Sequence, residues 1–536
     1  MAYSCFTIKR TREPLLMLIG RTFTPLMSAV AYLGTLSLTV LAFWGLIGFE
    51  ETRFTPELLQ DTYLQNILSF TLYQALLSAL GSLLLAIPIA RALHRLRPAG
   101  RDQFLRLSLL AFVMPSLILI TGIVNLLGPQ SPFIDLLKEW KLFGLNGILI
   151  AHIYLNFPLA VRILYQGYSS IPLNREQLAD QLKFSFWQRL RHIEWPAIKS
   201  QVATLAGLIF ILCFNSFAIV LTLGGGPKAT TLELAIYQAL KYDFNLNEAL
   251  TLAWLQFAIA GLIYLALIYA SRVNWLGSTR EQPAYRLEQG VKVPIQLAFY
   301  LLGWVYLLGP LIALFITLNQ EALINYPYAA MLKAMGVSLL IALSASLLAL
   351  LTAIALLTPI RKAAQQVKPI QETLFSWLAN QSLVAPAMVL STGSYIWLIS
   401  RGLLETYATL MLILLNAFVL LPFLLSQLRP RFIQFDSQYA KLVGNLKLTP
   451  LERVRIIYPF IRRSLLAAFS LGLLLALGDV SIFAIFGSYE SPTLPWLIYT
   501  FAGTYRMSEA AITSVILLGL CYLLLILLER SVHHEQ

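Results

Sequence analysis

The sequence reads Leu182-Lys-Phe-Ser-Phe-Trp-Gln-Arg-Leu-Arg-His-Ile193 in its first half and Leu446-Lys-Leu-Thr-Pro-Leu-Glu-Arg-Val-Arg-Ile-Ile457 in its second. Leucine, lysine, two arginines and the last isoleucine recur in register, 264 residues apart and without a gap. Both copies are basic stretches that lie between long apolar segments. The chain therefore presents the same polar loop twice, once in each half.

The composition indicates a protein whose solvent is the lipid bilayer. Of 536 residues, 58% are hydrophobic and 12% are charged, with a mean hydropathy of +0.72, whereas soluble chains carry about 25% charged residues. The net charge of +13 does not indicate nucleic acid as a partner, because the basic residues lie between apolar runs. Cys5, Cys213 and Cys521 are widely scattered and no pair has metal or redox spacing, so the sequence gives no support for a disulfide framework or a zinc site.

Twelve apolar windows are long enough to cross the hydrocarbon core, which takes roughly 20 helical residues. They are 25–49, 67–90, 107–127, 146–165, 202–223, 250–270, 294–318, 334–358, 373–399, 406–427, 465–487 and 510–529. Prolines inside several windows do not disqualify them, since neighbouring helices can satisfy the carbonyl groups that proline leaves unpaired. We predict an all-α integral membrane protein with about twelve transmembrane helices.

The distribution of Lys and Arg predicts the orientation. If the N-terminus is cytoplasmic, most of the 39 Lys and Arg residues fall in cytoplasmic loops, as the positive-inside rule requires. The basic clusters on that side are 9–21, 91–106, 162–199, 272–292, 361–368 and 429–463. We therefore expect a multi-pass protein with both termini in the cytoplasm.

The two halves match at several further places in constant order. The matched pairs are Thr71 with Ser338, Pro115-x5-Thr121-Gly122 with Pro386-x5-Thr392-Gly393, Gly224 with Gly487, and Thr231-Leu232-x4-Tyr237 with Thr493-Leu494-x4-Tyr499. Both basic loops lie on one side of the membrane, so each repeat must cross an even number of times, which makes the repeat parallel rather than inverted. We predict two six-helix units, 1–280 and 281–536, with the path for cargo between them.

The loops 174–196 and 436–460 resemble the EAA segment of binding-protein-dependent ABC importer permeases. That segment reads Glu-Ala-Ala, three residues, Gly, nine residues, Ile, one residue, Leu-Pro. The first loop matches it with Gln177-Leu178-Ala179, Lys183 at the glycine position, Ile193 and Pro196; the second matches it with Lys441-Leu442-Val443, Lys447, Ile457 and, one residue early, Pro459. The resemblance implies the type I importer permease fold, with two short coupling helices that dock on a separate cytoplasmic ATPase.

An amphipathic helix that docks in a groove presents apolar anchors at helical spacing. The loop residues that the resemblance assigns to docking are Gln177, Leu178, Ala179, Leu182, Lys183, Trp187, Arg189 and Arg191 in the first loop, and Leu442, Val443, Leu446, Lys447, Leu451, Arg453 and Arg455 in the second. The arginines are expected to pair with acidic groups of the ATPase, or else to follow the positive-inside bias and face lipid phosphates. Two such loops predict two ATPase copies.

The chain lacks an ATP site of its own. The segment 224–228, Gly-Gly-Gly-Pro-Lys, has the wrong spacing for a phosphate-binding loop. Because no His, Asp and Glu residues cluster with catalytic or metal-ligand spacing, we expect neither an enzyme nor a metal site. ATP and Mg²⁺ are then used by the partner subunit, and this chain needs no cofactor.

The stretch 221–240 and the segment 192–196 resemble the corresponding parts of thiamine and thiamine pyrophosphate permeases, and the resemblance extends over nearly the whole chain. It implies a bacterial inner-membrane importer of thiamine and its phosphates that receives cargo from a periplasmic thiamine-binding protein. Ferric-iron permeases share parts of the pattern, so ferric iron or another small solute is the alternative cargo. A twelve-span secondary transporter is disfavoured because it needs ionisable pairs inside the membrane.

Three polar residues inside spans are candidates for lining the pathway. Asp479 is an acidic residue well inside a span, where a charge costs roughly 2.5–3.5 kcal/mol on insertion scales. It is either a counter-ion for the cationic thiazolium ring or a hydrogen-bond acceptor for helix ends. Asn215 and Ser216 occupy the corresponding place in the first half and either line the pathway or bond across helices.

Overall fold

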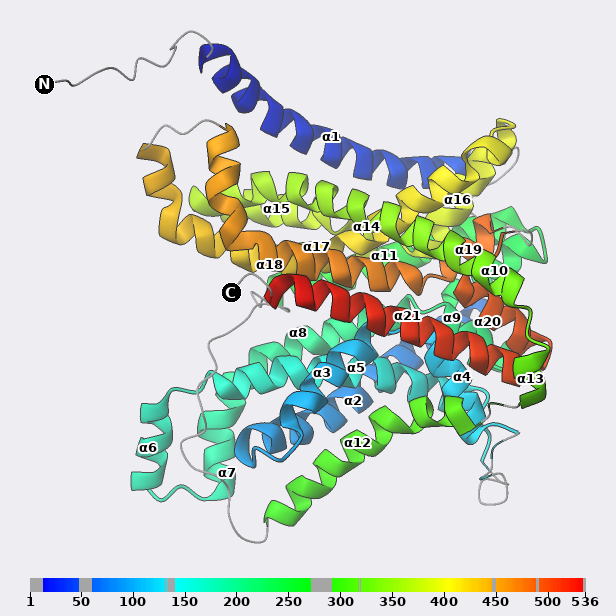
Figure 1. The fold of residues 1–536 in the computed structure, drawn as a ribbon, viewed down its shortest axis with the longest axis horizontal. Coiled ribbons are helices and arrows are strands. Elements are labelled where there is room, and N and C mark those ends of the chain that lie inside the picture. Colours follow the sequence, from blue (N-terminus) through cyan, green and yellow to red (C-terminus); the bar gives the residue numbers. More distant parts are fainter. Residues whose placement is uncertain are drawn as a thin grey trace, which may run out of the picture.

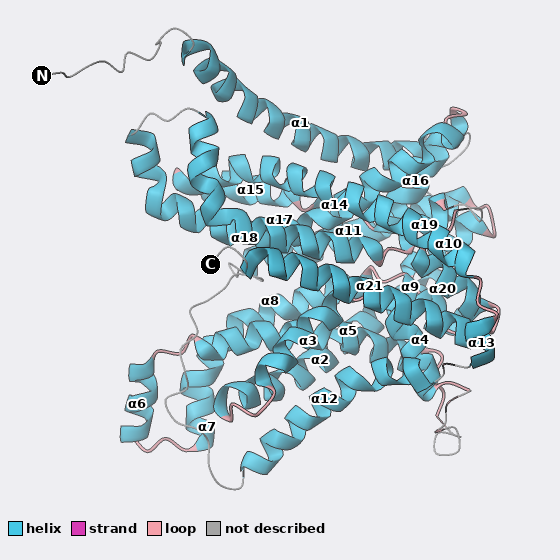
Figure 2. Ribbon diagram, in the orientation of Figure 1, coloured by secondary structure: helices cyan, strands magenta, loops and turns pink. Residues whose placement is uncertain are grey.

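The computed structural model describes residues 13–47, 60–129, 131, 133, 140–270, 292–316, 318, 320–445, 450–487 and 491–533. Within these ranges the chain consists of helices and loops and has no strand (Figure 2). Ten of the described helical segments are long and apolar enough to cross a membrane, and a bent helix pair makes an eleventh. The predicted all-α membrane architecture is confirmed.

Eight of the twelve predicted windows fall on one long helix each. These helices are α1 (Glu13–Ile47), α2 (Thr62–Arg95), α5 (Leu145–Ser169), α11 (Leu246–Ala270), α12 (Lys292–Ile316), α14 (Tyr328–Gln365), α17 (Leu404–Asn445) and α21 (Met507–His533). The fifth window of each half begins on a long helix, α8 (Trp195–Phe214) or α18 (Pro450–Leu477). Pro88, Pro158, Pro310 and Pro422 lie within α2, α5, α12 and α17 without ending them. Proline was therefore tolerated at these four positions, as predicted.

The third window of each half is broken at its matched proline. In the first half, α3 (Arg101–Val113) and α4 (Ser116–Leu127) meet at an angle of 105°. In the second half, α15 (Pro369–Ala379), the 3₁₀ turn η4 (Gln381–Leu383) and α16 (Ala387–Ser400) replace one straight helix. Met114 is extended (φ −64°, ψ 136°) because the residue before proline disfavours the helical region. Pro115 and Pro386 then begin new helices.

The fifth window of each half is also interrupted at matched positions. α8 ends at Phe214 and is followed by α9 (Ala218–Leu223), while α18 ends at Leu477 and is followed by α19 (Ser481–Phe486). The three candidate pathway residues lie at these two interruptions. Each half therefore has two broken spans, the third and the fifth.

The first helix of each half packs against the other half. α1 lies along α14 and α16, whereas α12 lies along α2 and α4, on opposite edges of the molecule (Figure 1). Hydrogen bonds also join the exchanged helices to the other half, from Ser28 Oγ in α1 to the carbonyl of Ala355 in α14 (2.8 Å) and from Tyr154 Oη in α5 to that of Leu307 in α12 (2.7 Å). The predicted units 1–280 and 281–536 therefore exchange their first helices in the packed structure: α1 packs on the second unit and α12 packs on the first.

The matched glycines of the two halves lie where the exchanged helices approach most closely. A Cβ atom on Gly393 would overlap the carbonyl oxygen of Ala42 in α1, and a Cβ on Gly122 would overlap that of Pro310 in α12. Only glycine leaves room for a neighbouring backbone at this distance. The glycine after Pro-x5-Thr is therefore explained by the helix exchange.

A second matched motif caps a short helix in each half. α10 (Leu232–Lys241) and α20 (Leu494–Gly503) begin directly after the matched threonines. The backbone N–H of Leu232 donates to Thr71 Oγ1 (3.1 Å), and that of Leu494 donates to Ser338 Oγ (2.8 Å). A hydroxyl on the second span thus satisfies a backbone donor that the start of a helix leaves unpaired.

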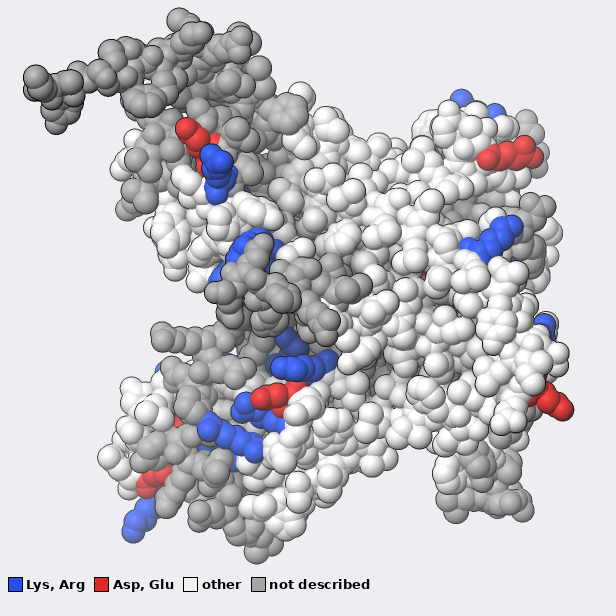
Figure 3. Space-filling view, viewed as in Figure 1, with Lys and Arg blue, Asp and Glu red and all other residues white. Residues whose placement is uncertain are grey.

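The two ends of the molecule differ. The start of α1, the end of α21, and the short helices α6 (Leu173–Gln181) and α7 (Phe186–Arg189) lie at one end, with the start of α18 (Figure 1). α9, α10, α19 and α20 lie at the other end. Lys and Arg side chains gather mainly at the first end (Figure 3). The regions of both predicted loops therefore share one end, as a parallel repeat requires.

Candidate functional site

The first predicted loop forms a projecting pair of short helices. α6 and α7 lead into a single π-helical turn, η2 (Leu190–Glu194), before α8. Leu178, Leu182 and Trp187 are 54%, 58% and 73% exposed, although all three are large and apolar. Gln177, Lys183 and Arg191 are exposed beside them, whereas Ala179 is buried against the body of the protein. The projecting surface therefore offers apolar anchors with a polar surround, as interaction sites do.

Lys183 occupies a backbone conformation that glycine prefers. Its φ is +51°, in the left-handed region. The N–H of Lys183 donates to the carbonyl of Asp180 and that of Phe184 to the carbonyl of Ala179, which together make the Schellman ending of α6. The glycine of the EAA pattern is thus a helix terminator, and this chain keeps the turn with a lysine in that position.

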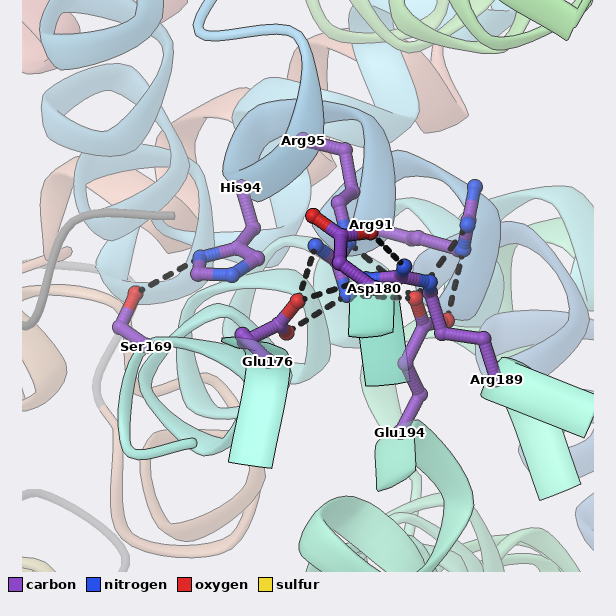
Figure 4. A network of polar contacts seen from close by, with 8 residues as sticks. All are labelled: Arg91, His94, Arg95, Ser169, Glu176, Asp180, Arg189 and Glu194. Atoms are coloured by element: carbon purple, nitrogen blue, oxygen red, sulfur yellow. Dashed lines mark hydrogen bonds and ion pairs between the residues drawn. The ribbon is translucent and has the colours of Figure 1, made fainter. Parts of the chain in front are cut away.

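A buried network of ion pairs joins this loop to the end of α2 (Figure 4). The carboxylate of Glu194 accepts from Arg91 Nε (2.7 Å) and from Arg95 Nη2 (2.9 Å). Arg95 also binds Glu176 through both terminal nitrogens, at 2.9 and 2.7 Å. Glu194 is 0% exposed, and Arg95 and Glu176 are nearly as buried. The loop is therefore fixed rigidly to a membrane-spanning helix.

Arg189 belongs to this network rather than to the projecting surface. Its guanidinium donates to Glu176 (2.9 Å) and to Asp180 (2.6 Å), which ties α7 to α6. The prediction that Arg189 pairs with acidic groups on a partner does not fit this arrangement, because its donors are directed into the chain. Sequence reasoning missed Glu176 and Glu194, whose only signal was that they are acidic residues in a basic loop.

The second loop is described only in part. α17 continues to Asn445 and α18 begins at Pro450. Leu446 and Lys447 lie outside the described residues, as do the side chains of Leu442, Val443, Leu451 and Arg453, while Arg455 is exposed. Near this loop, the described ion pairs are Arg361 with Asp436 (2.6 Å) and Arg429 with Glu372 (2.5 Å). Among the described residues these two pairs share no side chain.

The broken spans of the two halves meet in the middle of the molecule. Asn215, after the end of α8, donates through Nδ2 to the carbonyl of Leu383 in η4 (3.1 Å). Gly478, after the end of α18, lies against Pro115, between α3 and α4. Each fifth-span break thus contacts the third-span break of the other half. Asn215 bonds across the halves, and the adjacent Ser216 is half-buried.

Asp479 caps a short helix. Its carboxylate accepts long hydrogen bonds from the backbone N–H groups of Ile482 (3.5 Å) and Phe483 (3.3 Å) at the start of α19. Asn416 Nδ2 is 3.5 Å from the same carboxylate. A carboxylate is favoured at a helix N-terminus by these donors and by the helix dipole. Of the two predicted roles, hydrogen bonding to a helix end fits the geometry directly.

Comparison with known proteins identifies the family. Residues 82–274 match the family model described as "binding-protein-dependent transport system inner membrane component". The chain is 34% identical over 488 residues to the thiamine transport system permease protein ThiP of Escherichia coli (strain K12). The matched region covers 88% of this chain and 90% of that protein. It is 36% identical to ThiP of Brucella abortus (strain 2308), with 88% of each chain covered.

This chain belongs to the binding-protein-dependent transport permeases. It is a multi-pass inner-membrane transport subunit and not an enzyme. A ferric transport system permease protein, FbpB of Actinobacillus pleuropneumoniae, is 26% identical over only 43% of this chain. The resemblance to the importer permeases, including the thiamine permeases, is therefore confirmed over almost the full length.

The permease contains a further buried carboxylate that sequence reasoning passed over. Glu233, in the first turn of α10, is 1% exposed, and burial raises the pKa of its carboxyl to about 8, although a hydrogen bond from Gln256 opposes the shift. Gln256 Nε2 donates to Asn215 Oδ1 (3.1 Å). Glu233 is thereby linked to the central contact between the halves. The matching residue of the second half is Pro495, so the repeat gave no signal for it.

Proposed function

We propose that this chain is the permease subunit of an ATP-driven importer of thiamine and thiamine phosphates. The observation that carries the proposal is its similarity to proteins named thiamine transport system permeases, at 34–36% identity over 88% of the chain. A match of this extent includes both halves, both loops and the central helix breaks. We infer the cargo from these relatives' names and from the resemblance in the stretch 221–240.

The proposed partners are two copies of a cytoplasmic ATPase and a periplasmic thiamine-binding protein. The end with α6 and α7 would face the cytoplasm, together with both chain termini. Leu178, Leu182 and Trp187 would insert into a groove of one ATPase copy, in the manner of an amphipathic helix in a hydrophobic groove. The second loop, 436–460, would dock the other copy.

ATP would act through the two loops. Closure of the ATPase dimer around ATP and Mg²⁺ would draw the loops together and turn the permease from an inward-open to an outward-open form. Shifting a two-state equilibrium from 1:99 to 99:1 takes about 5.5 kcal/mol of differential binding. The ion pairs of Glu194 with Arg91 and Arg95 would carry the movement of the first loop directly to α2.

Reconstituted transport tests the proposal. The permease is reconstituted with the ATPase in proteoliposomes, and the binding protein is added on the opposite side of the membrane. Uptake of labelled thiamine is then measured with ATP supplied to the ATPase side. We expect uptake that requires ATP and the binding protein. Uptake driven by a proton gradient without the ATPase would instead indicate a secondary transporter, and ATP-dependent uptake of ferric iron but not thiamine would refute the cargo.

A further inference from the structure

A pocket of about 160 Å³ lies between the two halves of the permease, on α3 and α5 from one half and on α17 and α18 from the other. Four polar side chains line it: Arg162, Gln166, Gln427 and Ser470. Arg162 and Gln166 are one helical turn apart in the last two turns of α5, so they share a face of that helix. The rest of the lining is apolar, and includes Phe112 and Leu474.

The polar lining is suited to an anionic group. It supplies one guanidinium, two amides and one hydroxyl, and no Asp or Glu is among the described residues that line the pocket. Arg162 donates through Nη1 to the carbonyl of Leu105 (3.4 Å), which orients the guanidinium beside the pocket. Arginine binds phosphate oxygens through several parallel donors, and such charge-assisted hydrogen bonds are roughly twice as strong as neutral ones.

We propose that this pocket binds the phosphate group of phosphorylated cargo, with Arg162 as the main ligand. This inference rests on the proposed function, because thiamine phosphates are the anionic forms of the proposed cargo. Thiamine itself carries a cationic ring and no phosphate, so it gains nothing from Arg162. The pocket would therefore determine how well the importer handles phosphorylated forms relative to thiamine.

The position of the pocket links binding to the transport cycle. Arg162 and Gln166 belong to the first half, whereas Gln427 and Ser470 belong to the second. A relative movement of the halves separates the two pairs of ligands, so the phosphate group loses ligands when the permease changes its form. Occupation of the pocket would thus be coupled to that change.

The test compares uptake of thiamine and of thiamine pyrophosphate by the reconstituted importer carrying Arg162→Gln. We expect roughly a tenfold or larger loss of thiamine pyrophosphate uptake, which corresponds to one lost charge-assisted hydrogen bond, with thiamine uptake retained. Retained thiamine uptake also demonstrates that the variant is folded. Arg162→Lys should restore part of the thiamine pyrophosphate uptake, and Arg106→Gln, which removes an exposed charge on α3, should change neither uptake.

Three results would overturn the inference. Unchanged uptake of both forms by Arg162→Gln would remove Arg162 from cargo binding. An equal loss for both forms would indicate a structural role, or a phospholipid headgroup in the pocket in place of cargo phosphate. If the wild-type importer transports neither form, the proposed function fails, and the assignment of the pocket fails with it.

Discussion

Replacing Glu194 with glutamine should destabilise the permease far more than the same change at Glu372. Glu194 is fully buried and accepts hydrogen bonds from both Arg91 and Arg95 at 2.7–3.3 Å. The glutamine keeps one acceptor oxygen but turns an amide donor toward two guanidinium groups. Arg91 then loses the carboxylate of Glu194 while it stays buried.

The burial of each ion pair sets the expected magnitude. Removing one partner of a buried ion pair costs about 3–5 kcal/mol. Because Arg95 keeps Glu176 as a partner, we expect Glu194→Gln to lower the free energy of unfolding by about 3 kcal/mol, the lower end of that range. Glu372 pairs with Arg429, but the two side chains are 28% and 33% exposed. Both groups are half-buried and partly screened by solvent, so we expect this pair to contribute closer to the ~0–1 kcal/mol of a surface pair, and Glu372→Gln is the matched control.

The assay is equilibrium unfolding of the purified permease in mixed detergent micelles, together with amide hydrogen exchange over residues 173–194. Glu194→Gln should shift the unfolding midpoint and speed exchange in α6 and α7, and Glu372→Gln should do neither. If both variants shift the midpoint equally, the network contributes no more than a surface ion pair, and rigid attachment of the first loop to α2 is refuted.

Three further predictions concern single residues. The left-handed backbone conformation of Lys183 costs about 1–2 kcal/mol in the folded state, and Lys183→Gly removes this strain. Amide hydrogen exchange at the end of α6 should therefore slow, and faster exchange would contradict this expectation. Gly393→Ala should lower the free energy of unfolding by about 1–3 kcal/mol, because α1 must move away, whereas Gly519→Ala, in open space on α21, should not destabilise the protein. Because burial raises the pKa of Glu233 from 4.5 to about 8, the folded state holds that proton more tightly than the unfolded state, and wild-type stability falls as the pH rises from about 4.5 to about 8. The melting temperature of Glu233→Gln relative to wild type should therefore increase between pH 5 and pH 8, and a constant difference would refute the shift.

The spans and the repeat were predictable from the sequence because both depend on local information. Apolar length identifies a spanning helix in any context, and Pro115 with Gly122 recurs as Pro386 with Gly393. The helix breaks were not predictable with the same rules. Pro88, Pro158, Pro310 and Pro422 stay inside continuous helices, and only tertiary packing distinguishes them from Pro115 and Pro386, where helices are broken.

The contacts between distant segments could not be read from the sequence. Leucine-rich helices carry little information about their neighbours, so nothing indicated that α1 packs on α14 and α16. The partners of Arg95 lie 81 and 99 residues away, at Glu176 and Glu194. Nothing in the sequence indicated that Arg189 pairs with Glu176 and Asp180 within the chain. The apolar residues of the first loop were predicted from the resemblance to the EAA segment, and Leu178, Leu182 and Trp187 are exposed, while their docking on an ATPase stays a prediction.

The central claim is that the two matched loops each bind one ATPase subunit. Native mass spectrometry of the detergent-solubilised permease with a saturating excess of the ATPase tests it most directly. We expect a complex of one permease chain with two ATPase copies, and loss of at least one copy with Trp187→Asp, which places a charge among the exposed apolar residues of the first loop. A wild-type complex with a single ATPase, or no complex at all, would contradict it.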